Sequence, residues 1–380
     1  MKILIAIGVR RQEEAGAAGV ALNHGRELAK RGHQVDCWFL DDVLPRPTRP
    51  KRLEAVIFAH RVAQRILRNR REYDVVNIHA PWGCVYGMVR RFYHSPEAPP
   101  YVMTMQGSEE RYTRAMRREH EKGRASNFGW KNRIWHGLYH QKMYDWSIRT
   151  ADFGAVANRE ACVMAELKYN CEPGRIRYVP NGVSQEFFKG RSYAPRSPLQ
   201  LLYVGTWLDR KGVYYLAESF QMLAREEASV RLTVAGCGNS EFEVKQCFAR
   251  DTHDHVAVIP FVPRSEMPAL YANHDIFVFP SLVEGMPLTL LEAMASGMPV
   301  VTTTSSGMSD VVENGFNGVL VPPANSLELY RAIRSLCEDA ELRCRLGREA
   351  QITMRRYTWE CVTSKLEELL VLAAAEEKGR

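Results

Sequence analysis

The sequence of 380 residues contains no apolar run near the ~20 residues that a membrane-spanning helix requires. It also lacks the features of an export signal, because the apolar start over residues 3–7 is short and Arg10 and Arg11 follow it closely. The start instead has the composition of a first β-strand that ends at a glycine turn. We therefore expect a soluble, cytoplasmic protein.

Signals for disulfides and metal sites are equally scarce. The nine cysteines are dispersed, no pair has the C-x-x-C spacing, and no histidine spacing indicates zinc. The adjacent Asp41 and Asp42 are a poor candidate for a metal site. An odd number of scattered cysteines without an export signal is typical of free thiols in a reducing compartment. We expect no metal and no cofactor.

Positive charge is concentrated in the first half of the chain. Residues 1–200 hold 34 Lys and Arg against 20 Asp and Glu, whereas residues 201–380 hold 17 against 24. The basic residues gather in the stretches Arg46–Arg52, Arg61–Arg71, Arg90–Arg91 and Arg111–Arg124. They are either solvated helix faces or a surface attracted to an anionic membrane or an acidic acceptor. Nucleic acid is not expected as a partner, because no helix-turn-helix, zinc or RNA-recognition motif accompanies the charge.

Short apolar runs alternate with helical stretches along nearly the whole chain. The expected strands are residues 2–8, 34–40, 74–79, 101–105, 153–158 and 176–180 in the first half, and 199–205, 231–235, 256–261, 276–280, 299–303 and 318–321 in the second. Their apolar residues are continuous rather than alternating, which favours parallel sheets buried on both faces. The predicted fold class is α/β, with two Rossmann-like, doubly wound parallel-sheet domains.

The boundary between the two domains is expected near the stretch Gly190–Pro198. This stretch is rich in proline, serine and arginine and has no apolar periodicity, as is typical of a linker. We place an N-terminal domain at residues 1–195 and a C-terminal domain at residues 196–358, followed by an amphipathic helix at about 359–380. Ligands of such folds bind at the carboxyl ends of the strands, so we expect a central cleft between the facing domains.

The most informative segment is PSLVEGMPLTLLEAMASG, residues 280–297. A strand ends at its start, a short loop carries Glu284 and Gly285, and a helix is expected from about Pro287, because proline suits the first helical position. The start of a helix favours an anion such as a diphosphate, and glycine lets the backbone come close to it. The carboxylates of Glu284 and Glu292 can each accept two hydrogen bonds from the paired hydroxyls of a sugar or ribose.

The E-x7-E spacing of Glu284 and Glu292 within EGMPLTLLEAMASGMPV resembles the donor-site signature of glycosyltransferase family 4. An isolated pair of glutamates at this spacing would carry little weight, but the match extends over seventeen residues. By this resemblance, Glu284 binds hydroxyls of the donor sugar and Glu292 binds the ribose. The backbone that holds the diphosphate would be that of Gly285, Met286, Pro287 and Leu288.

A second segment, YVGTWLDRKG over Tyr203–Gly212, resembles the family's strand, glycine turn and Lys-Gly pair that bind the pyrophosphate. The resemblance assigns Lys211 to this role, although a lysine beside a turn can also be a plain surface residue. The family often has an arginine directly after the glycine, where this chain has Thr206, and Arg210 is expected to substitute for it. Neighbouring guanidinium and ammonium groups neutralise a departing diphosphate.

Three positions in the first half are also assigned. The segment Gly16–Gly19 matches the family's glycine-rich loop and places Gly19 near the donor phosphates. His79 ends a predicted strand, where it either lines the acceptor side or is a packed histidine. The family usually has histidine where this chain has Gln106, and glutamine can form hydrogen bonds but cannot titrate, which excludes proton transfer there. Glu109 and Glu110 follow, either as a nucleophile or base or as ion-paired carboxylates.

The resemblance implies the GT-B fold, with the final helix crossing back onto the first domain, and a retaining, metal-independent glycosyltransferase. The donor would be a nucleotide diphosphate sugar, with UDP the commonest carrier. The acceptor would be a glycan or a lipid-linked molecule in cell-surface polysaccharide or glycolipid synthesis. From the basic charge of the first domain we expect peripheral binding to the inner face of the cell membrane. The alternatives are a nucleotide-sugar epimerase and a non-catalytic nucleotide-sugar-binding protein. A nicotinamide-dependent oxidoreductase is disfavoured, because the first strand is not followed by G-x-G-x-x-G.

Overall fold

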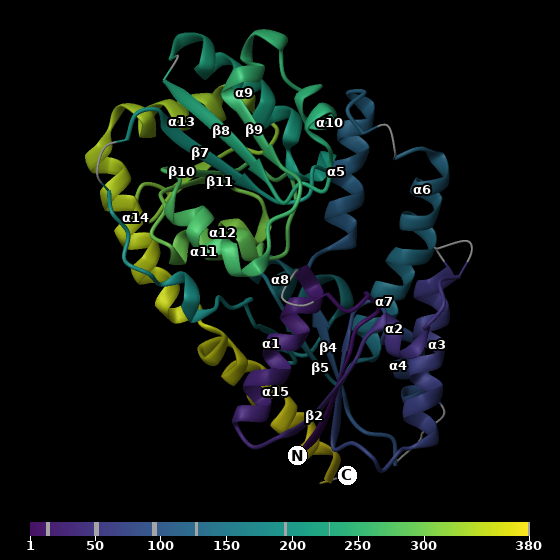
Figure 1. Cartoon of the computed structure of the whole chain (residues 1–380). Coiled ribbons are helices and arrows are strands. Elements are labelled where there is room, and N and C mark those ends of the chain that lie inside the picture. Colours follow the sequence, from purple (N-terminus) through teal and green to yellow (C-terminus); the bar gives the residue numbers. More distant parts are fainter. Residues whose placement is uncertain are drawn as a thin grey trace. The chain divides into compact units, whose positions relative to one another are not determined.

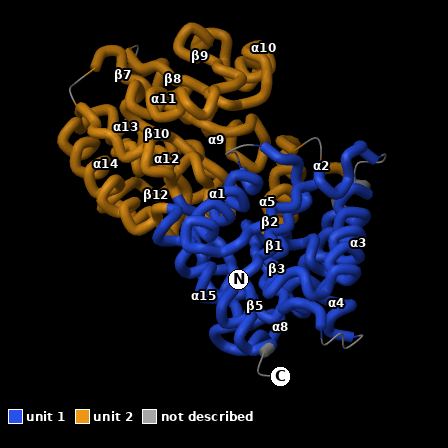
Figure 2. The backbone as a smooth tube through the Cα atoms, turned by 60° about the horizontal axis from the view of Figure 1, so that its bottom comes forward, with its two compact units in different colours: residues 1–110, 130–182, 359–380 blue, residues 111–129, 183–358 orange. Residues whose placement is uncertain are grey.

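The computed structural model describes residues 1–12, 16–48, 53–92, 97–125, 128–193, 196–227 and 229–378. Part of the basic stretch Arg46–Arg52 and part of the expected linker Gly190–Pro198 lie outside the described residues. The chain forms two compact units, shown in different colours in Figure 2. Unit 1 comprises residues 1–110, 130–182 and 359–380, and unit 2 comprises residues 111–129 and 183–358.

Unit 1 is built on a six-stranded sheet of order β2-β1-β3-β4-β5-β6, with all neighbouring strands parallel. Its strands are β1 Lys2–Ala6, β2 Gln34–Trp38, β3 Val75–His79, β4 Tyr101–Met105, β5 Phe153–Val156 and β6 Ile176–Tyr178. Its helices are α1 Gly16–Lys30, α2 Leu40–Val43, α3 Leu53–Arg68, α4 Cys84–Phe92, the start of α5 Glu109–Glu121, α6 Trp130–Ile134, the π-helix η1 Trp135–His140, α7 Gln141–Thr150, α8 Arg159–Tyr169 and α15 Trp359–Lys378.

Unit 2 contains a second six-stranded parallel sheet, of order β12-β11-β10-β7-β8-β9. Its strands are β7 Leu199–Val204, β8 Val230–Ala235, β9 Val256–Ile259, β10 Ile276–Phe279, β11 Val300–Thr303 and β12 Val319–Val321. Its α-helices are α9 Val213–Glu226, α10 Glu241–Lys245, α11 Met267–Ala272, α12 Leu288–Ala295, α13 Ser326–Glu338 and α14 Ala340–Met354. Short 3-10 helices are η2 Gln185–Phe187, η3 Asp209–Lys211, η4 Arg250–His255, η5 Arg264–Glu266, η6 Ser306–Met308 and η7 Arg355–Tyr357.

The predicted fold class is confirmed. All twelve expected strands are present, most of them ending one or two residues earlier than the sequence indicates, and they form the two parallel sheets. The continuous apolar runs are explained by burial on both sheet faces. Leu4 and Val76 lie in one apolar cluster with Phe58 of α3, whereas the neighbouring Ile3 lies in a second cluster with Leu366 of α15.

The final helix belongs to unit 1, although most of the preceding residues belong to unit 2. Helix α15 contacts α1 as well as β3, β4 and β5, and Figure 1 shows it beside α1. Leu366 and Leu369 are at most 1% exposed. Since burying one leucine contributes about 2 kcal/mol, this helix is an integral part of the first core.

The two units contain other segments of the chain than the two domains predicted from the sequence. The sequence places the boundary at residue 195, whereas contacts assign the chain from Val183 onward to unit 2. They also assign Arg111–Gly129, which includes most of α5, to unit 2. The chain therefore passes between the units more often than the linker alone indicates.

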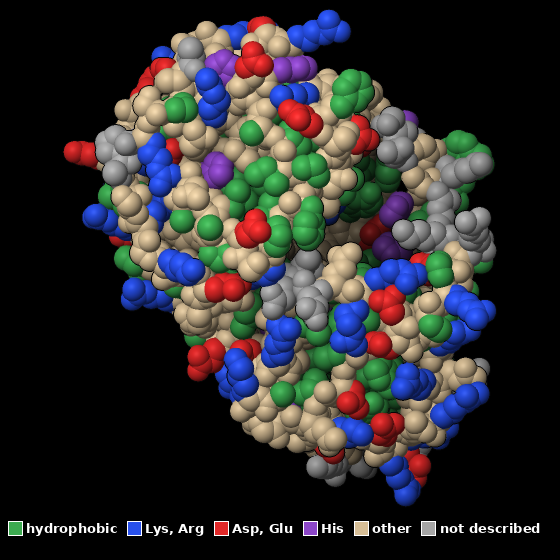
Figure 3. Space-filling model, viewed as in Figure 1, with side chains coloured by type: hydrophobic (Ala, Val, Ile, Leu, Met, Phe, Trp, Pro, Cys, Tyr) green, Lys and Arg blue, Asp and Glu red, His purple; other side chains and the backbone are tan. Residues whose placement is uncertain are grey.

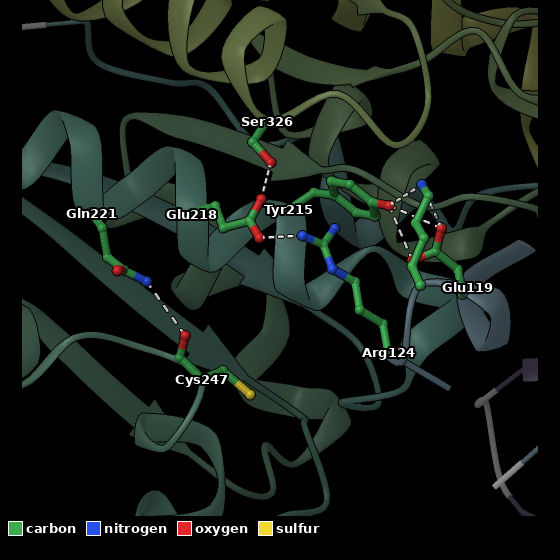
Figure 4. A network of polar contacts seen from close by, with 8 residues as sticks. Glu119, Arg124, Tyr215, Glu218, Gln221, Cys247 and Ser326 are labelled. Atoms are coloured by element: carbon green, nitrogen blue, oxygen red, sulfur yellow. Dashed lines mark hydrogen bonds and ion pairs between the residues drawn. The ribbon is translucent and has the colours of Figure 1, made fainter. Parts of the chain in front are cut away.

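A buried polar network holds α5 against α9 within unit 2 (Figure 4). The hydroxyl of Tyr215 donates a 2.8 Å hydrogen bond to Oε1 of Glu119 and accepts one of 2.8 Å from Nζ of Lys122. Glu218 is bonded to both Arg124 and Ser326. Glu119 is only 2% exposed, so its carboxylate depends on these partners for the hydrogen bonds that it loses from water.

The fold shows whether the cysteines and the Asp41–Asp42 pair have partners. All nine cysteines are free, as expected. Asp41 and Asp42 pair with Arg10 and Arg11 at 2.7 Å and 3.0 Å, so both carboxylates already have cationic partners. Across the described parts of the chain, no helix combines the length and the apolar character needed to cross a bilayer.

Candidate functional site

The loop that follows β10 is held in place by hydroxyl groups from β11 and the segment after it. The hydroxyl of Thr303 donates to the carbonyl of Ser281 at 2.6 Å, and that of Ser305 donates to the carbonyl of Leu282 at 2.8 Å. Within the loop, Oγ of Ser281 donates to Oε1 of Glu284 at 2.9 Å. The carboxylate of Glu284 is thereby fixed at the carboxyl edge of the second sheet.

Two cations meet Glu284 at this edge. Nη1 of Arg210 and Nζ of Lys211 both lie 2.7 Å from Oε1 of Glu284. Burial acts to raise the pKa of Glu284, but the charges of Lys211 and Arg210 hold it below its ordinary value. Burial lowers the pKa of Lys211, and the charge of Glu284 opposes this effect. The structure thus brings together the residue predicted to bind the donor sugar, Glu284, and the two predicted to neutralise the departing diphosphate, Lys211 and Arg210.

A close backbone contact places Lys211 beside the loop. Gly212 has a φ of 72°, and an added Cβ would lie 2.0 Å from the carbonyl oxygen of Pro280. Arg210 also accepts a hydrogen bond of 2.8 Å at its carbonyl from the amide of Leu282. Only glycine fits at this point, which explains the Lys-Gly pair that the sequence contains.

Glu292 lies in a separate cluster of unit 2. Its side chain accepts a 2.9 Å hydrogen bond from the hydroxyl of Tyr271 and an ion-paired bond from Arg264. Glu292 is 4% exposed, and burial raises its pKa against the opposing effect of Arg264. The sequence predicted neither partner, because no motif or spacing links Arg264 or Tyr271 to Glu292.

The expected diphosphate-binding backbone lies between the two carboxylates. Helix α12 begins at Leu288, with Pro287 in the capping position before it rather than in the first helical position. Gly285 and Met286 are buried, and an added Cβ at Gly307 would lie 1.6 Å from the carbonyl oxygen of Gly285. The segment around Gly307 therefore closes directly over this backbone.

Two further contacts complete this part of unit 2. The carbonyl of Thr206 accepts a 3.0 Å hydrogen bond from the hydroxyl of Tyr203. Arg111, near the start of α5, donates to Oγ of Ser306 at 3.2 Å. Arg111, which was not assigned to the site from the sequence, is thus bonded to the 3-10 helix η6 that contains Gly307.

The residues assigned from the first half lie in unit 1. Gly19 is part of the first turns of α1, so the expected glycine-rich loop at Gly16–Gly19 is helical. The expectation of a loop was wrong because the small residues continue the apolar helical face, of which Ala18 and Gly19 are buried. The assignment of Gly19 to the donor phosphates stays a prediction. Gln106 is half-buried directly after β4.

His79 is the last residue of β3 and is 2% exposed. Burial and the charge of His24 lower its pKa to about 3, so the ring is neutral. Its Nδ1 is buried without a hydrogen-bond partner among the described residues. The burial fits a packed histidine, while the unpaired nitrogen leaves a role on the acceptor side open.

One cluster of titratable groups was not predicted from the sequence, although Glu109 was a candidate base. Glu109 contacts His136 and His140, which are four residues apart on the π-helix η1. The H-x3-H spacing in WHGLYH was available in the sequence as a signal for neighbouring rings on one helical face. Glu110 instead pairs with Lys168 at 2.6 Å, so both glutamates have cationic or imidazole partners.

Comparison with known proteins matches the two halves of the chain to two glycosyltransferase models. Residues 184–353 match the model of "Glycosyl transferases group 1", and residues 15–187 match that of "Glycosyltransferase Family 4". Similar solved structures include a sucrose-phosphate synthase from Thermosynechococcus elongatus, with a TM-score of 0.76, 17% identity and coverage of 99% of both chains. Another is Anabaena Alr3699/HepE in complex with UDP-glucose, with a TM-score of 0.71, 17% identity and coverage of 98% of this chain and 99% of the other.

Both halves of the chain are thus similar to glycosyltransferases. A putative colanic acid biosynthesis glycosyltransferase, WcaL of Salmonella typhimurium, is 30% identical over 53% of this chain and 52% of its own length. The amylovoran biosynthesis glycosyltransferase AmsK of Erwinia amylovora is 30% identical over 45% of this chain and 44% of its own. The match thus spans about half the length of these curated relatives.

Proposed function

We propose that this glycosyltransferase relative is a retaining enzyme of family 4 that transfers a sugar from a nucleotide diphosphate to a glycan or lipid-linked acceptor. The observation that carries the proposal is the cluster of Arg210, Lys211 and Glu284 beside the start of α12. Two cations next to a helix start are suited to a diphosphate, and a carboxylate between them is suited to sugar hydroxyls.

In this proposal, charged residues of unit 2 make the main electrostatic contribution to the transfer reaction. Lys211 and Arg210 stabilise the negative charge that develops on the departing diphosphate, which is commonly the largest contribution to such a reaction. Glu284 orients the donor sugar, and Glu292 binds the ribose. We assign no metal to the chemistry, because the two side-chain cations supply the charge that a metal would otherwise supply.

The choice of donor and acceptor classes rests on the relatives. Structures of HepE contain UDP or UDP-glucose, and the names of the WcaL and AmsK relatives assign them to colanic acid and amylovoran biosynthesis. We therefore propose UDP as the carrier and a cell-surface polysaccharide precursor as the acceptor.

The first test is thermal stabilisation of the full chain by UDP, GDP, ADP and TDP. Ligand at 100 times its Kd stabilises the folded state by about 2.7 kcal/mol. We expect UDP to stabilise the parent and the control Lys245→Ala, whose side chain pairs with the exposed Glu241. Glu292→Ala should lose this response. If no nucleotide stabilises the parent, the proposal is wrong.

Turnover separates a transferase from a non-catalytic nucleotide-sugar-binding protein. UDP-sugars are incubated with the enzyme in the presence of EDTA, and release of UDP is measured with and without polysaccharide-precursor acceptors. We expect acceptor-dependent release that EDTA does not abolish, with the anomeric configuration of the donor kept in the product. UDP binding without release would favour the binding protein.

We also propose peripheral attachment of unit 1 to an anionic membrane. On the face shown in Figure 3, Lys and Arg side chains are interspersed with Asp and Glu, so attachment would depend on local groups rather than on a continuous basic surface. Trp130 is 68% exposed and Tyr139 is 59% exposed, and both side-chain types favour the membrane interface. Flotation with anionic vesicles at low salt is the test, and recovery of the protein only in the unbound fraction would exclude the idea.

A further inference from the structure

Three side chains with metal-ligating atoms meet at the start of α5. Glu109 is the first residue of that helix, and His136 and His140 lie on η1. One ligand atom from each of the three lies within 4.8 Å of the other two. The Glu109 side chain is only 8% exposed, and those of His136 and His140 are 23% and 20% exposed, so the carboxylate is buried and the two imidazoles are partly accessible.

Both histidines lie close to Glu109, but one imidazole nitrogen lacks a hydrogen bond. Nδ1 of His136 lies 2.5 Å from Oε1 of Glu109, and Nδ1 of His140 lies 2.9 Å from Oε2. The second distance is that of an ion pair, but the contact lacks the geometry of a hydrogen bond. In the described part of the chain, Nδ1 of His140 is therefore buried without a hydrogen-bond partner. A buried nitrogen of this kind normally has a partner, which can be a metal ion.

The local backbone aligns the two histidines. Side chains four positions apart on a helix are neighbours on the same face. The rings of His136 and His140 have centroids 5.6 Å apart at an angle of 86°. The ring of Trp135 stacks on His140, and Tyr144 contacts it edge-on, so aromatic groups cover this side of the cluster. Single π-turns frequently occur at functional sites.

We propose that Glu109, His136 and His140 bind one divalent transition-metal ion of the Zn²⁺ class. Two imidazole nitrogens and a carboxylate oxygen are a donor set that zinc favours, and three protein ligands leave one position for water. Calcium and magnesium are disfavoured because they require mainly oxygen ligands. At tetrahedral bond lengths of about 2.0–2.1 Å, ligand atoms lie about 3.3 Å apart. Nδ1 of His136 and Oε1 of Glu109, now 2.5 Å apart, would need to separate only slightly, and all three ligand atoms already lie within 4.8 Å of one another.

Such an ion would tie the start of α5 to η1 inside unit 1. It is distinct from the proposed donor site, all of whose assigned charged residues lie in unit 2. A metal bound to the folded state only would raise the stability of this unit by mass action.

The test uses the full chain after treatment with a chelator and dialysis. We expect one equivalent of Zn²⁺ to bind, and one equivalent of Co²⁺ to give the visible absorption of a four-coordinate site. His140→Ala and Glu109→Gln should lower the Zn²⁺ affinity by at least about 100-fold, more than is typical for losing an outer-shell partner. His60→Ala is the matched control, because His60 lies on α3 and bonds only to the carbonyl of Val56 among the contacts described.

Two results would overturn the proposal. One is a parent protein that takes up no stoichiometric Zn²⁺ or Co²⁺, and the other is an equal loss of affinity in His60→Ala and His140→Ala. If His140→Ala does not fold, His140→Asn and the Co²⁺ spectrum of the parent still decide the question. Thermal stabilisation by UDP is measured on the same samples, so failure of the metal site and failure of the proposed nucleotide site are distinguished.

Discussion

Nζ of Lys211 lies 2.7 Å from Oε1 of Glu284, and both side chains are only 11% exposed. The two residues are far apart in sequence, on the segment after β7 and the loop after β10, and Gly212 allows the segments to touch. A nearly buried ion pair of this kind places a positive charge at the sheet edge without leaving either group unpaired. A diphosphate that binds here would compete with Glu284 for Lys211.

Replacing Lys211 by alanine is therefore expected to affect catalysis more than folding. Loss of one group that stabilises developing charge typically lowers kcat by about 100- to 1000-fold, and we expect a loss in that range. Arg210 remains beside Glu284, so the carboxylate keeps one cationic partner. Initial rates of UDP release check the prediction, with Lys245→Ala as the control. A loss of less than about threefold would contradict a role in the transfer step.

Gly307→Ala is expected to disturb the nucleotide site directly. Its Cβ would lie 1.6 Å from the carbonyl oxygen of Gly285, a backbone atom that cannot move without displacing the loop. We expect the stabilisation by UDP to fall by at least about 2 kcal/mol, corresponding to a Kd weakened by about 30-fold. The control is Gly190→Ala in the same unit, where an added Cβ has no heavy atom within 4 Å. Equal UDP responses in the two variants would show that the segment around Gly307 does not shape the site.

Arg264→Ala should destabilise the protein through the buried carboxylate of Glu292. Removing one partner of a buried pair commonly costs about 3–5 kcal/mol. Because the Arg264 side chain is 24% exposed, we expect a smaller loss, of about 2 kcal/mol. In the double variant Arg264→Ala, Glu292→Gln most of this loss should be recovered, since the neutral amide needs no counter-charge. Urea denaturation measures both values, and an unimproved double variant would show that the arginine acts through packing alone.

The sheets could be predicted from the sequence because their strands carry a strong local signal. Residues 276–279, for example, are all buried, so every position in that strand is apolar. The proximity of Lys211 and Glu284 was predictable only through the resemblance, which places both motifs in one family pattern. The contacts of Glu292 could not be predicted, because Arg264 and Tyr271 reach it through the packing of η5 and α11.

The packing of α5 against unit 2 also could not be predicted from sequence patterns. Its sequence is strongly charged, and nothing local indicates that Glu119 is 2% exposed. Burial there depends on Tyr215 and Lys122, whose hydroxyl and ammonium groups satisfy the carboxylate. The contact between Tyr215 and Glu119 joins residues nearly one hundred positions apart, beyond the range of any helical or strand periodicity.

The stability of unit 1 is expected to depend on pH through His24, a buried residue of α1 whose side chain contacts α15. Its Nδ1 is 2.9 Å from the hydroxyl of Thr363, its ring meets Trp359 edge-on, and burial lowers its pKa to about 4. An unfolded histidine has a pKa of about 6.5, so between these values the unfolded state binds about one proton more than the folded state. The contribution of His24 is thus complete above pH 6.5 and is lost as the pH falls toward 4.

We expect this group to account for up to about 3 kcal/mol of the acid-induced loss of stability. The variant His24→Asn keeps a polar atom near Thr363 but does not titrate in this range. Urea denaturation at pH 7, 6 and 5 should therefore show a weaker dependence of the free energy of unfolding on pH in His24→Asn than in the parent. His60→Asn, on the exposed face of α3, should retain the parent's dependence. Identical pH dependence in the parent and His24→Asn would mean that His24 takes up its proton without unfolding of unit 1.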